Sequence, residues 1–226
     1  MLLQPLFNQK ENEDKIRLIR AEYQSLNALM NPHFIFNTLN NVQSLYHEND
    51  LVAANEYLRI FADLVRQNMQ NIAKELIPLQ KEINLVENYL LLEKMRFEKK
   101  LNYEIIIDKD LDISGIMIPP LLIQPLVENS IKHGILHRAN GKGEIMVNIF
   151  EQNDILFIEV RDNGIGINKS AAKKENGHEA MGIENIKKRI RQLSIIQNKE
   201  ITFNITEKKN ENGENEFTSV TISIPV

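Results

Sequence analysis

Apolar residues in the first half of the chain recur every three or four positions, with charged and polar residues between them. This period predicts amphipathic helices, because residues three and four apart lie on one helical face. The pattern predicts three of them, over residues 14–30, 36–46 and 51–65. Pro32 interrupts the first, so this helix either kinks near Ala28 or restarts with Asn31 as its cap.

The helices over 36–46 and 51–65 are separated by four polar residues, and this arrangement predicts a helical hairpin. A hairpin with a continuous apolar stripe cannot bury that stripe alone. Pairing of two copies in a four-helix bundle would cover it, so we expect a homodimer. A further helix is predicted after Pro78 and runs to Phe97, with Glu82 and Glu87 on its outer face.

The second half changes to a period of two, which is typical of strands. The predicted strands lie at residues 103–107, 145–150, 155–160, 201–205 and 218–224, and helices at 120–136 and 182–197 lie between them. This order predicts an α+β sandwich, a mixed sheet covered by helices on one face. The boundary near 97–101 divides the chain into a helical domain, 1–98, and a second domain, 99–226. The Lys-, Asn- and Glu-rich stretch 207–216 is predicted to be an exposed hairpin loop.

Composition narrows the class of protein. The 226 residues are 42% hydrophobic and 26% charged, as in soluble folded proteins. A net charge of -4 argues against a nucleic-acid-binding surface. The absence of cysteine excludes disulfides and thiol nucleophiles and suits a reducing, cytoplasmic compartment. The longest apolar run, 116–127, is too short to span a bilayer, and the first residues lack the features of a signal peptide. A membrane anchor would therefore lie outside this chain.

A polar cluster lies within residues 125–134. Glu128, Asn129, Lys132 and His133 share one face of a predicted helix whose other positions are apolar. Polar side chains on a core helix cost free energy unless each finds a partner. Two interpretations stay open at this point: a ligand, such as a nucleotide with its magnesium, or a satisfied polar network between helix and sheet.

Residues 162–166, Asp-Asn-Gly-Ile-Gly, follow a predicted strand and precede a long irregular segment that ends at Met181. Glycines allow a ligand close to the backbone, and Asp162 can accept a hydrogen bond from an exocyclic amine such as that of adenine. An ordinary turn explains the motif equally well. Gly182 is predicted to open a helix whose free N–H groups, with Lys169, Lys173 or Lys174, would hold phosphates. A solvated loop also explains these lysines.

Taken together, PPLLIQPLVENSIKHG, DNGIG and the glycine-ended segment resemble the N, G1 and G2 boxes of the GHKL ATP-binding superfamily. The upstream NPHFIFNTLNN resembles the phosphoacceptor box of LytS-type sensor histidine kinases. The sequence ENYLLLEKMRFEKKL is similar to the connector of those kinases. The resemblance extends over residues 26–225, with the boxes in family order.

The resemblance implies a role for each residue at a matching position. Asn129 would be a magnesium ligand, and Glu128 would bind or orient metal-bound water. Lys132 and His133 would contact phosphate oxygens, and Asp162 would accept a hydrogen bond from the adenine amine. Gly164 and Gly166 would leave room for the base and the lid, and Thr218 is a weaker candidate for a second contact with adenine.

The resemblance also implies that His33 attacks the γ-phosphorus of ATP, with Asn37 one helical turn later positioning the imidazole or a water. The phosphoryl group would then pass to an aspartate of a response regulator, one with a LytTR-type DNA-binding domain. A second reading is a catalytically weak nucleotide-binding relative that acts through dimer contacts or as a phosphatase. A chaperone-type ATPase is disfavoured by the phosphoacceptor box.

The chain departs from the family pattern at several positions. Leu29 replaces the usual glutamine, and Ala180 or Phe217 stands where a glycine is usual. Phe34 follows His33, where larger kinase families carry an acid, so the general base is not identified. His133 and His137 lie one turn apart, but no third ligand accompanies them, and a zinc site is not expected.

Overall fold

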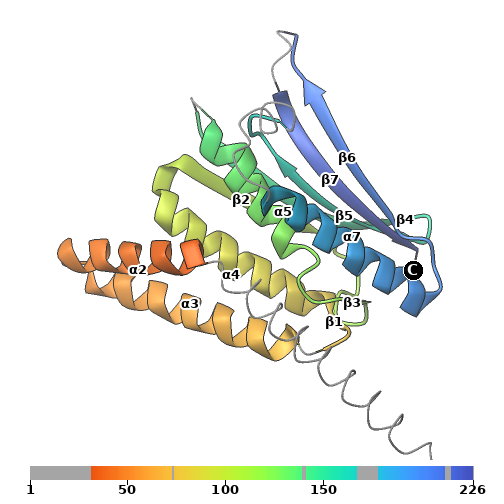
Figure 1. Cartoon of the computed structure of the whole chain (residues 1–226), viewed down its shortest axis with the longest axis horizontal. Helices are drawn as coiled ribbons and strands as arrows, with labels where there is room; N and C mark the ends of the chain where they lie inside the picture. Colours follow the sequence, from red (N-terminus) through yellow and green to blue (C-terminus); the bar gives the residue numbers. More distant parts are fainter. Residues whose placement is uncertain (1–31, 73, 139–140, 167–177, 212–214, 226) are drawn as a thin grey trace, which may run out of the picture. The chain divides into compact units, whose positions relative to one another are not determined.

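The computed structural model describes residues 32–72, 74–138, 141–166, 178–211 and 215–225 (Figure 1). The chain divides into two compact units, Met1–Glu75 and Leu76–Val226. The boundary expected at 98/99 between a helical phosphoacceptor domain and an ATP-binding domain stays a prediction, and the division into compact units falls earlier in the sequence. None of the helices in the described ranges is long and apolar enough to cross a membrane.

The first unit contains the predicted helical hairpin. Helix α2 spans Pro32–His47 and helix α3 spans Leu51–Ile72. The turn between them includes Asn49 at a φ of 62°, and an Asp50 carboxylate oxygen accepts a hydrogen bond from the Ala53 amide at 3.0 Å. Such a cap satisfies an amide that has no partner within the helix, which explains why α3 begins here. The hairpin is confirmed, whereas the helix expected at 14–30 lies outside the described residues.

The second unit is built on a five-stranded mixed sheet with the order β2-β4-β5-β7-β6. β2 and β4 are parallel, and the other neighbouring pairs are antiparallel. The strands are β2 Leu101–Ile107, β4 Gly143–Gln152, β5 Ile155–Asp162, β6 Thr202–Lys209 and β7 Asn215–Pro225. A two-residue pairing of β1, Ile77–Pro78, with β3, Met117–Ile118, lies beside it.

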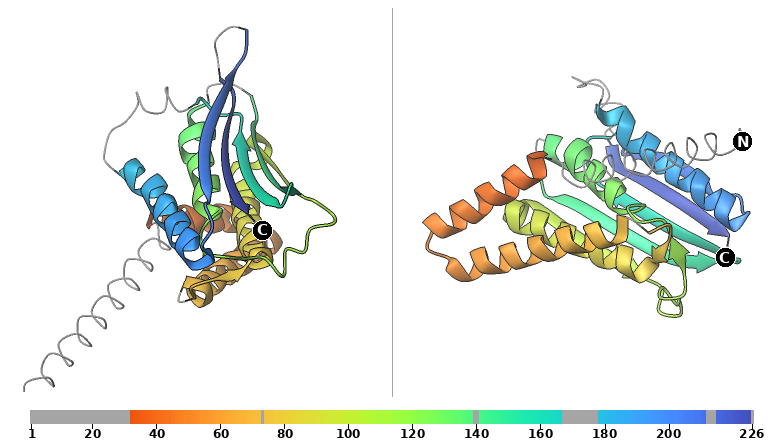
Figure 2. Two further views of the ribbon diagram at one scale, coloured as in Figure 1. Left: turned by 90° about the vertical axis from the view of Figure 1, so that its right-hand side faces the viewer. Right: turned by 60° about the horizontal axis from the view of Figure 1, so that its bottom comes forward.

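Helices α4, Leu79–Phe97, α5, Gln124–Asn129, and α7, His178–Gln197, cover one face of this sheet (Figure 2). Alternate strand residues point toward them, because side chains of a strand alternate between its two faces. Buried residues from both layers form the core, among them Val147, Ile149, Ile158, Val160 and Ile222 of the sheet and Leu85, Leu92, Val127, Ile186 and Leu193 of the helices. The expected α+β architecture is thereby confirmed.

The helix expected over 120–136 is not regular. It comprises α5, a π turn η2, Ser130–Gly134, and a 3-10 turn η3, Ile135–His137. The stretch 207–216 is also not a simple loop, since β6 runs to Lys209 and β7 begins at Asn215. The Lys208 ammonium meets the Glu216 carboxylate at 2.9 Å. Charged residues fit these strand ends because their side chains remain in solvent.

The helical pattern predicts Glu82 on the outer face of α4, and this prediction is wrong. Glu82 is fully buried, with 0% of its surface exposed. Its carboxylate accepts hydrogen bonds from the backbone amides of Leu121, Ile123 and Gln124 at 2.9, 2.9 and 3.3 Å. These amides precede or begin α5 and have no intrahelical partner. Burial raises the pKa of Glu82, while the amides and the charge of Arg189 act in the opposite direction.

We expect Glu82→Ala to lower the free energy of unfolding by roughly 3 kcal/mol, because it leaves three buried amides unpaired and removes the charge that faces Arg189. Urea denaturation measures this loss. Glu87→Ala, at an exposed position of the same helix, serves as control and should change the stability by less than about 0.5 kcal/mol. Equal effects of the two substitutions would contradict the role given to Glu82.

Candidate functional site

Glu128 is the centre of the polar cluster on α5 and η2. Its Oε1 accepts a hydrogen bond from Gln124 Nε2 at 3.1 Å, and its Oε2 accepts one from Lys132 Nζ at 2.9 Å. The side chains of Lys132 and Glu128 keep 28% and 25% of their surface exposed. Asn129 ends α5, and His133 lies in η2. The cluster is thus a polar network that solvent and a ligand can still reach.

Helix α4 adds a charge that the sequence reasoning missed. Glu93 has only 2% of its side chain exposed, and both its carboxylate oxygens accept hydrogen bonds from Arg96 Nη1, at 3.0 and 3.1 Å. Burial raises the pKa of Glu93 to about 7, while the charges of Arg96 and Lys132 lower it and that of Glu128 raises it. The charges of Glu93 and the cluster therefore act on each other. The sequence did contain a signal for this buried charge, because Glu93 stands at a position of the helical pattern where an apolar residue is expected.

Asp162 ends β5 on the helix-covered side and is 5% exposed. One carboxylate oxygen accepts a hydrogen bond from the Gly164 amide at 2.9 Å, and the Ser130 hydroxyl donates a second. Burial raises the pKa of Asp162 to about 6, although both hydrogen bonds act to lower it. The carboxylate is therefore held in a fixed position and carries a charge near neutral pH.

Two glycines bring this turn against the polar cluster. A Cβ on Gly164 would lie 2.3 Å from the Cα of Gly134, and one on Gly134 would lie 2.6 Å from Asp162 Oδ1. The Ile165 amide also donates to the Gly134 carbonyl at 3.2 Å. Only glycine permits so close a backbone contact. Residues 125–134 and 162–166, distant in the sequence, are thereby joined in one place.

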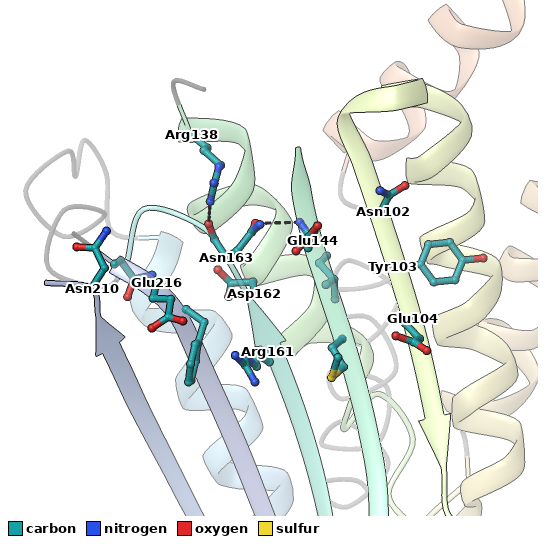
Figure 3. A pocket seen from close by; sticks show the side chains of 14 residues that line it. Asn102, Tyr103, Glu104, Arg138, Glu144, Arg161, Asp162, Asn163, Asn210 and Glu216 are labelled. Atoms are coloured by element: carbon teal, nitrogen blue, oxygen red, sulfur yellow. Dashed lines mark hydrogen bonds between the residues drawn. The ribbon is translucent and has the colours of Figure 1, made fainter. Parts of the chain in front are cut away.

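Asn163 attaches the same turn to the start of β4 (Figure 3). Its Oδ1 accepts a hydrogen bond from the Glu144 amide at 2.9 Å, and its Nδ2 donates to the Lys142 carbonyl at 3.1 Å. The Arg138 guanidinium donates to the Asn163 carbonyl. The Asp-Asn-Gly sequence is thus more than an isolated turn, because its backbone is fixed from two directions.

Thr218 of β7 lies directly opposite Asp162 of β5 in the sheet register. Asn215 Nδ2 donates to Thr218 Oγ1 at 3.2 Å and to the Gly164 carbonyl at 3.0 Å. Gly166 has a φ of +84°, and a Cβ there would lie 3.1 Å from that of Asn215. Asn215 therefore connects three of the expected binding residues. Sequence reasoning missed it because it falls in a stretch expected to be loop.

Phe217, one of the departures from the family pattern, points to the opposite face of the sheet from Thr218. The guanidinium of Arg161 lies 3.5 Å from the centre of its ring. A hollow of about 700 Å³ lies along this region, and its lining includes Phe217, Arg161, Asn215 and Asp162 (Figure 3). The phenylalanine therefore does not occupy the side of the sheet on which Asp162 and Thr218 lie.

Lys169 lies outside the described residues, as do Lys173 and Lys174, so their expected contacts with phosphate stay predictions. Gly182 does not open a helix, because α7 begins at His178, and the amide of a fifth helical residue is within reach of an intrahelical partner. His33 and Asn37 lie in α2, in the first compact unit.

The side-chain oxygen atoms of this cluster suit magnesium that is bound together with a nucleotide better than a metal ion held by protein side chains alone. In the ranges that the structure describes, no group of three or more His, Cys, Asp or Glu side chains could hold a metal. Asn129 and Glu128 offer oxygen atoms, and magnesium typically completes its coordination with phosphates and water. Near the Asp162 turn, Asn215 Oδ1 is buried without a partner among the described residues, so this oxygen can still accept a hydrogen bond.

Comparison with known proteins identifies two family matches. Residues 21–101 match a model described as "Histidine kinase", and residues 120–226 match one described as "Histidine kinase-, DNA gyrase B-, and HSP90-like ATPase". Together they account for most of the chain, and they include both the phosphoacceptor-like box and the residues expected to bind the nucleotide.

Individual relatives are sensor kinases. The chain is 36% identical to the Sensor protein LytS of Staphylococcus saprophyticus over 187 residues, which is 79% of this chain and 31% of that protein. It is 38% identical to the Sensor histidine kinase/phosphatase LytS of Staphylococcus aureus, over 70% of this chain and 27% of that protein. The chain thus spans less than a third of these relatives. The histidine kinase domain of a blue-light-activated kinase from Erythrobacter litoralis matches with a TM-score of 0.48 and 16% identity, covering 82% of this chain and 93% of that one.

Proposed function

Because the chain belongs to the histidine kinase family, we propose that it is the ATP-dependent kinase core of a two-component sensor. It binds Mg-ATP, phosphorylates His33 and transfers the phosphoryl group to an aspartate of a response regulator. The observation that carries this proposal is the backbone contact of Gly134 with Gly164, which places the acidic and basic groups of the polar cluster beside the Asp162 turn.

The two ends of this site suit the two ends of ATP. Asp162 accepts a hydrogen bond from the adenine amine, and Thr218 makes a second contact with the base. Lys132 and His133 contact phosphate oxygens, while Glu128 and Asn129 would hold the magnesium directly or through water. Bound magnesium would offset the negative charge of the phosphates during transfer.

Lys132 has to exchange partners when the nucleotide binds. In the structure its ammonium lies 2.9 Å from a Glu128 carboxylate oxygen. Phosphate oxygens would draw the ammonium away, because they carry more negative charge than one carboxylate. The Glu128 oxygen that Lys132 releases is then free for a metal-bound water. Phosphate and metal binding are therefore coupled through this ion pair.

The transfer step uses His33 in its neutral form. An imidazole nitrogen attacks the γ-phosphorus, a nitrogen–phosphorus bond forms, and the bond from phosphorus to the ADP oxygen breaks. The proton on the other nitrogen is released to solvent. Asn37, four residues along α2, is on the same helical face and positions the ring. The receiving regulator is proposed to be of the LytTR type.

The hairpin offers a surface for pairing of two chains. Phe36, Tyr46 and Val52 of α2 and α3 have 65%, 66% and 82% of their surface exposed. Apolar groups of this size on paired helices favour a partner that covers them. We therefore propose a homodimer with a four-helix bundle, located in the cytoplasm.

A second candidate function is dephosphorylation of the regulator. The Staphylococcus aureus relative is named as both kinase and phosphatase. A chain that binds nucleotide without labelling His33 would act in this way or through dimer contacts alone.

We expect γ-labelled ATP with magnesium to label the protein with phosphate that is stable to base and labile to acid, as phosphohistidine is. His33→Gln should abolish the label. His47→Gln, which removes the exposed histidine at the other end of α2, is the matched control and should retain it. Nucleotide binding with no label in the unsubstituted protein would contradict kinase activity and favour the second candidate.

We expect the affinity for Mg-ATP to fall as the pH is lowered through about 6, the value to which burial raises the pKa of Asp162. The adenine amine donates to the ionised carboxylate, and protonation removes that charge. Between pH 7 and pH 5 the dissociation constant should rise roughly tenfold, since each pH unit below the pKa leaves tenfold less carboxylate. Calorimetry with Asp162→Asn, which should bind weakly and without this pH step, tests the assignment. If the affinity of Asp162→Asn still falls near pH 6, a group other than Asp162 causes the pH dependence.

A further inference from the structure

The orientation of the Thr218 hydroxyl depends on Asn215. Asn215 begins β7, and its Nδ2 lies 3.2 Å from Thr218 Oγ1 and 3.0 Å from the Gly164 carbonyl oxygen. Thr218 itself is only 7% exposed and faces Asp162 across the two strands. The amide is therefore in contact with the side chain that, in the proposed function, touches the nucleobase.

The Asn215 amide can adopt only one orientation here. The Gly164 carbonyl is an acceptor and cannot donate, so it must face the NH2 group rather than the oxygen of the amide. The same NH2 group then faces Thr218. The amide oxygen, Oδ1, is buried and has no partner in the described part of the chain, so no contact at that end favours the reverse orientation. Turning the amide would place two oxygens against each other.

This orientation determines what the hydroxyl can do. Because Thr218 Oγ1 accepts from Asn215, its own hydrogen points elsewhere and is available to donate. Asp162 directly opposite is an acceptor when ionised, and side chains at opposing strand positions have Cβ atoms about 5 Å apart. The sheet thus presents an acceptor beside a donor. A base edge with an amine beside a bare ring nitrogen, as in adenine, is complementary to this pair, whereas the carbonyl and N–H of guanine are reversed.

We propose that Asn215 is a positioning residue that sets base selectivity, by fixing the Thr218 hydroxyl as a donor to the ring nitrogen beside the adenine amine. This inference rests on the proposed function, because it requires the nucleotide to bind next to Asp162. Asn215 acts through Thr218 and does not itself touch the base.

The test compares ATP with 1-deaza-ATP, which carries a C–H group in place of that ring nitrogen. With the full chain and magnesium, calorimetry should show ATP binding about tenfold more tightly, the effect of one hydrogen bond. Thr218→Val should bring the ratio of the two affinities close to one. Asn215→Asp should do the same, because a carboxylate only accepts and turns the hydroxyl toward itself. Asn204→Asp, the same change at an exposed position of β6, should leave the ratio unchanged.

A tenfold ratio that survives in Asn215→Asp would overturn the inference. If the added charge abolishes ATP binding, Asn215→Ala decides: it removes the donor without adding charge, so a lower ratio supports the inference and an unchanged one overturns it. Equal affinity of the unsubstituted protein for ATP and 1-deaza-ATP would refute this inference while leaving the proposed function intact. Failure of that protein to bind ATP at all would instead refute the proposed function.

Discussion

The contact between the backbones of Gly134 and Gly164 is the constraint on which the candidate site depends. A side chain at either position would meet atoms less than 2.7 Å away. The contact places the end of η2 against the turn that follows β5, and the Ile165 amide, the Ser130 hydroxyl and Asn215 hold the same turn. One close approach thus fixes Asp162 relative to Glu128, Asn129 and Lys132. The two motifs therefore form one candidate site.

Helix α4 holds the other side of this arrangement through two buried carboxylates. Glu82 binds the amides that lead into α5, and Glu93 lies where the charges of Lys132 and Glu128 reach it. A buried carboxylate that loses its partners is costly, so each contact favours the arrangement that keeps these partners in place. A displacement of α4 would therefore act on α5 at its start and on the polar cluster at its end. In the chain, α4 is also the first helix after the hairpin, and α2 of that hairpin contains His33.

Periodicity was sufficient to predict the hairpin, the strands and the mixed sheet, since each depends on which positions are apolar. It placed Glu82 in solvent, because spacing does not show that unpaired backbone amides elsewhere need an acceptor. Asn215 was missed for a related reason: its partners, Gly164 and Thr218, come from β5's turn and from β7, and only the sheet register brings them together. The π turn at 130–134 ends at Gly134, and a helical pattern does not encode the contact of that residue with Gly164. Motif matching placed Glu128, Asn129 and Asp162 in two segments that the fold brings together, and their roles in binding stay predictions.

The claim that the glycine contact assembles the nucleotide site is tested most directly by Gly164→Ala, with Mg-ATP affinity measured by calorimetry and folding followed by circular dichroism. The account predicts a loss of affinity of at least about tenfold in a chain that retains its helices, because the new methyl group must separate the two motifs. Gly115→Ala is the control, since its nearest neighbour would be a flexible Asp112 side chain at 3.0 Å. Unchanged Mg-ATP affinity in folded Gly164→Ala would contradict the account.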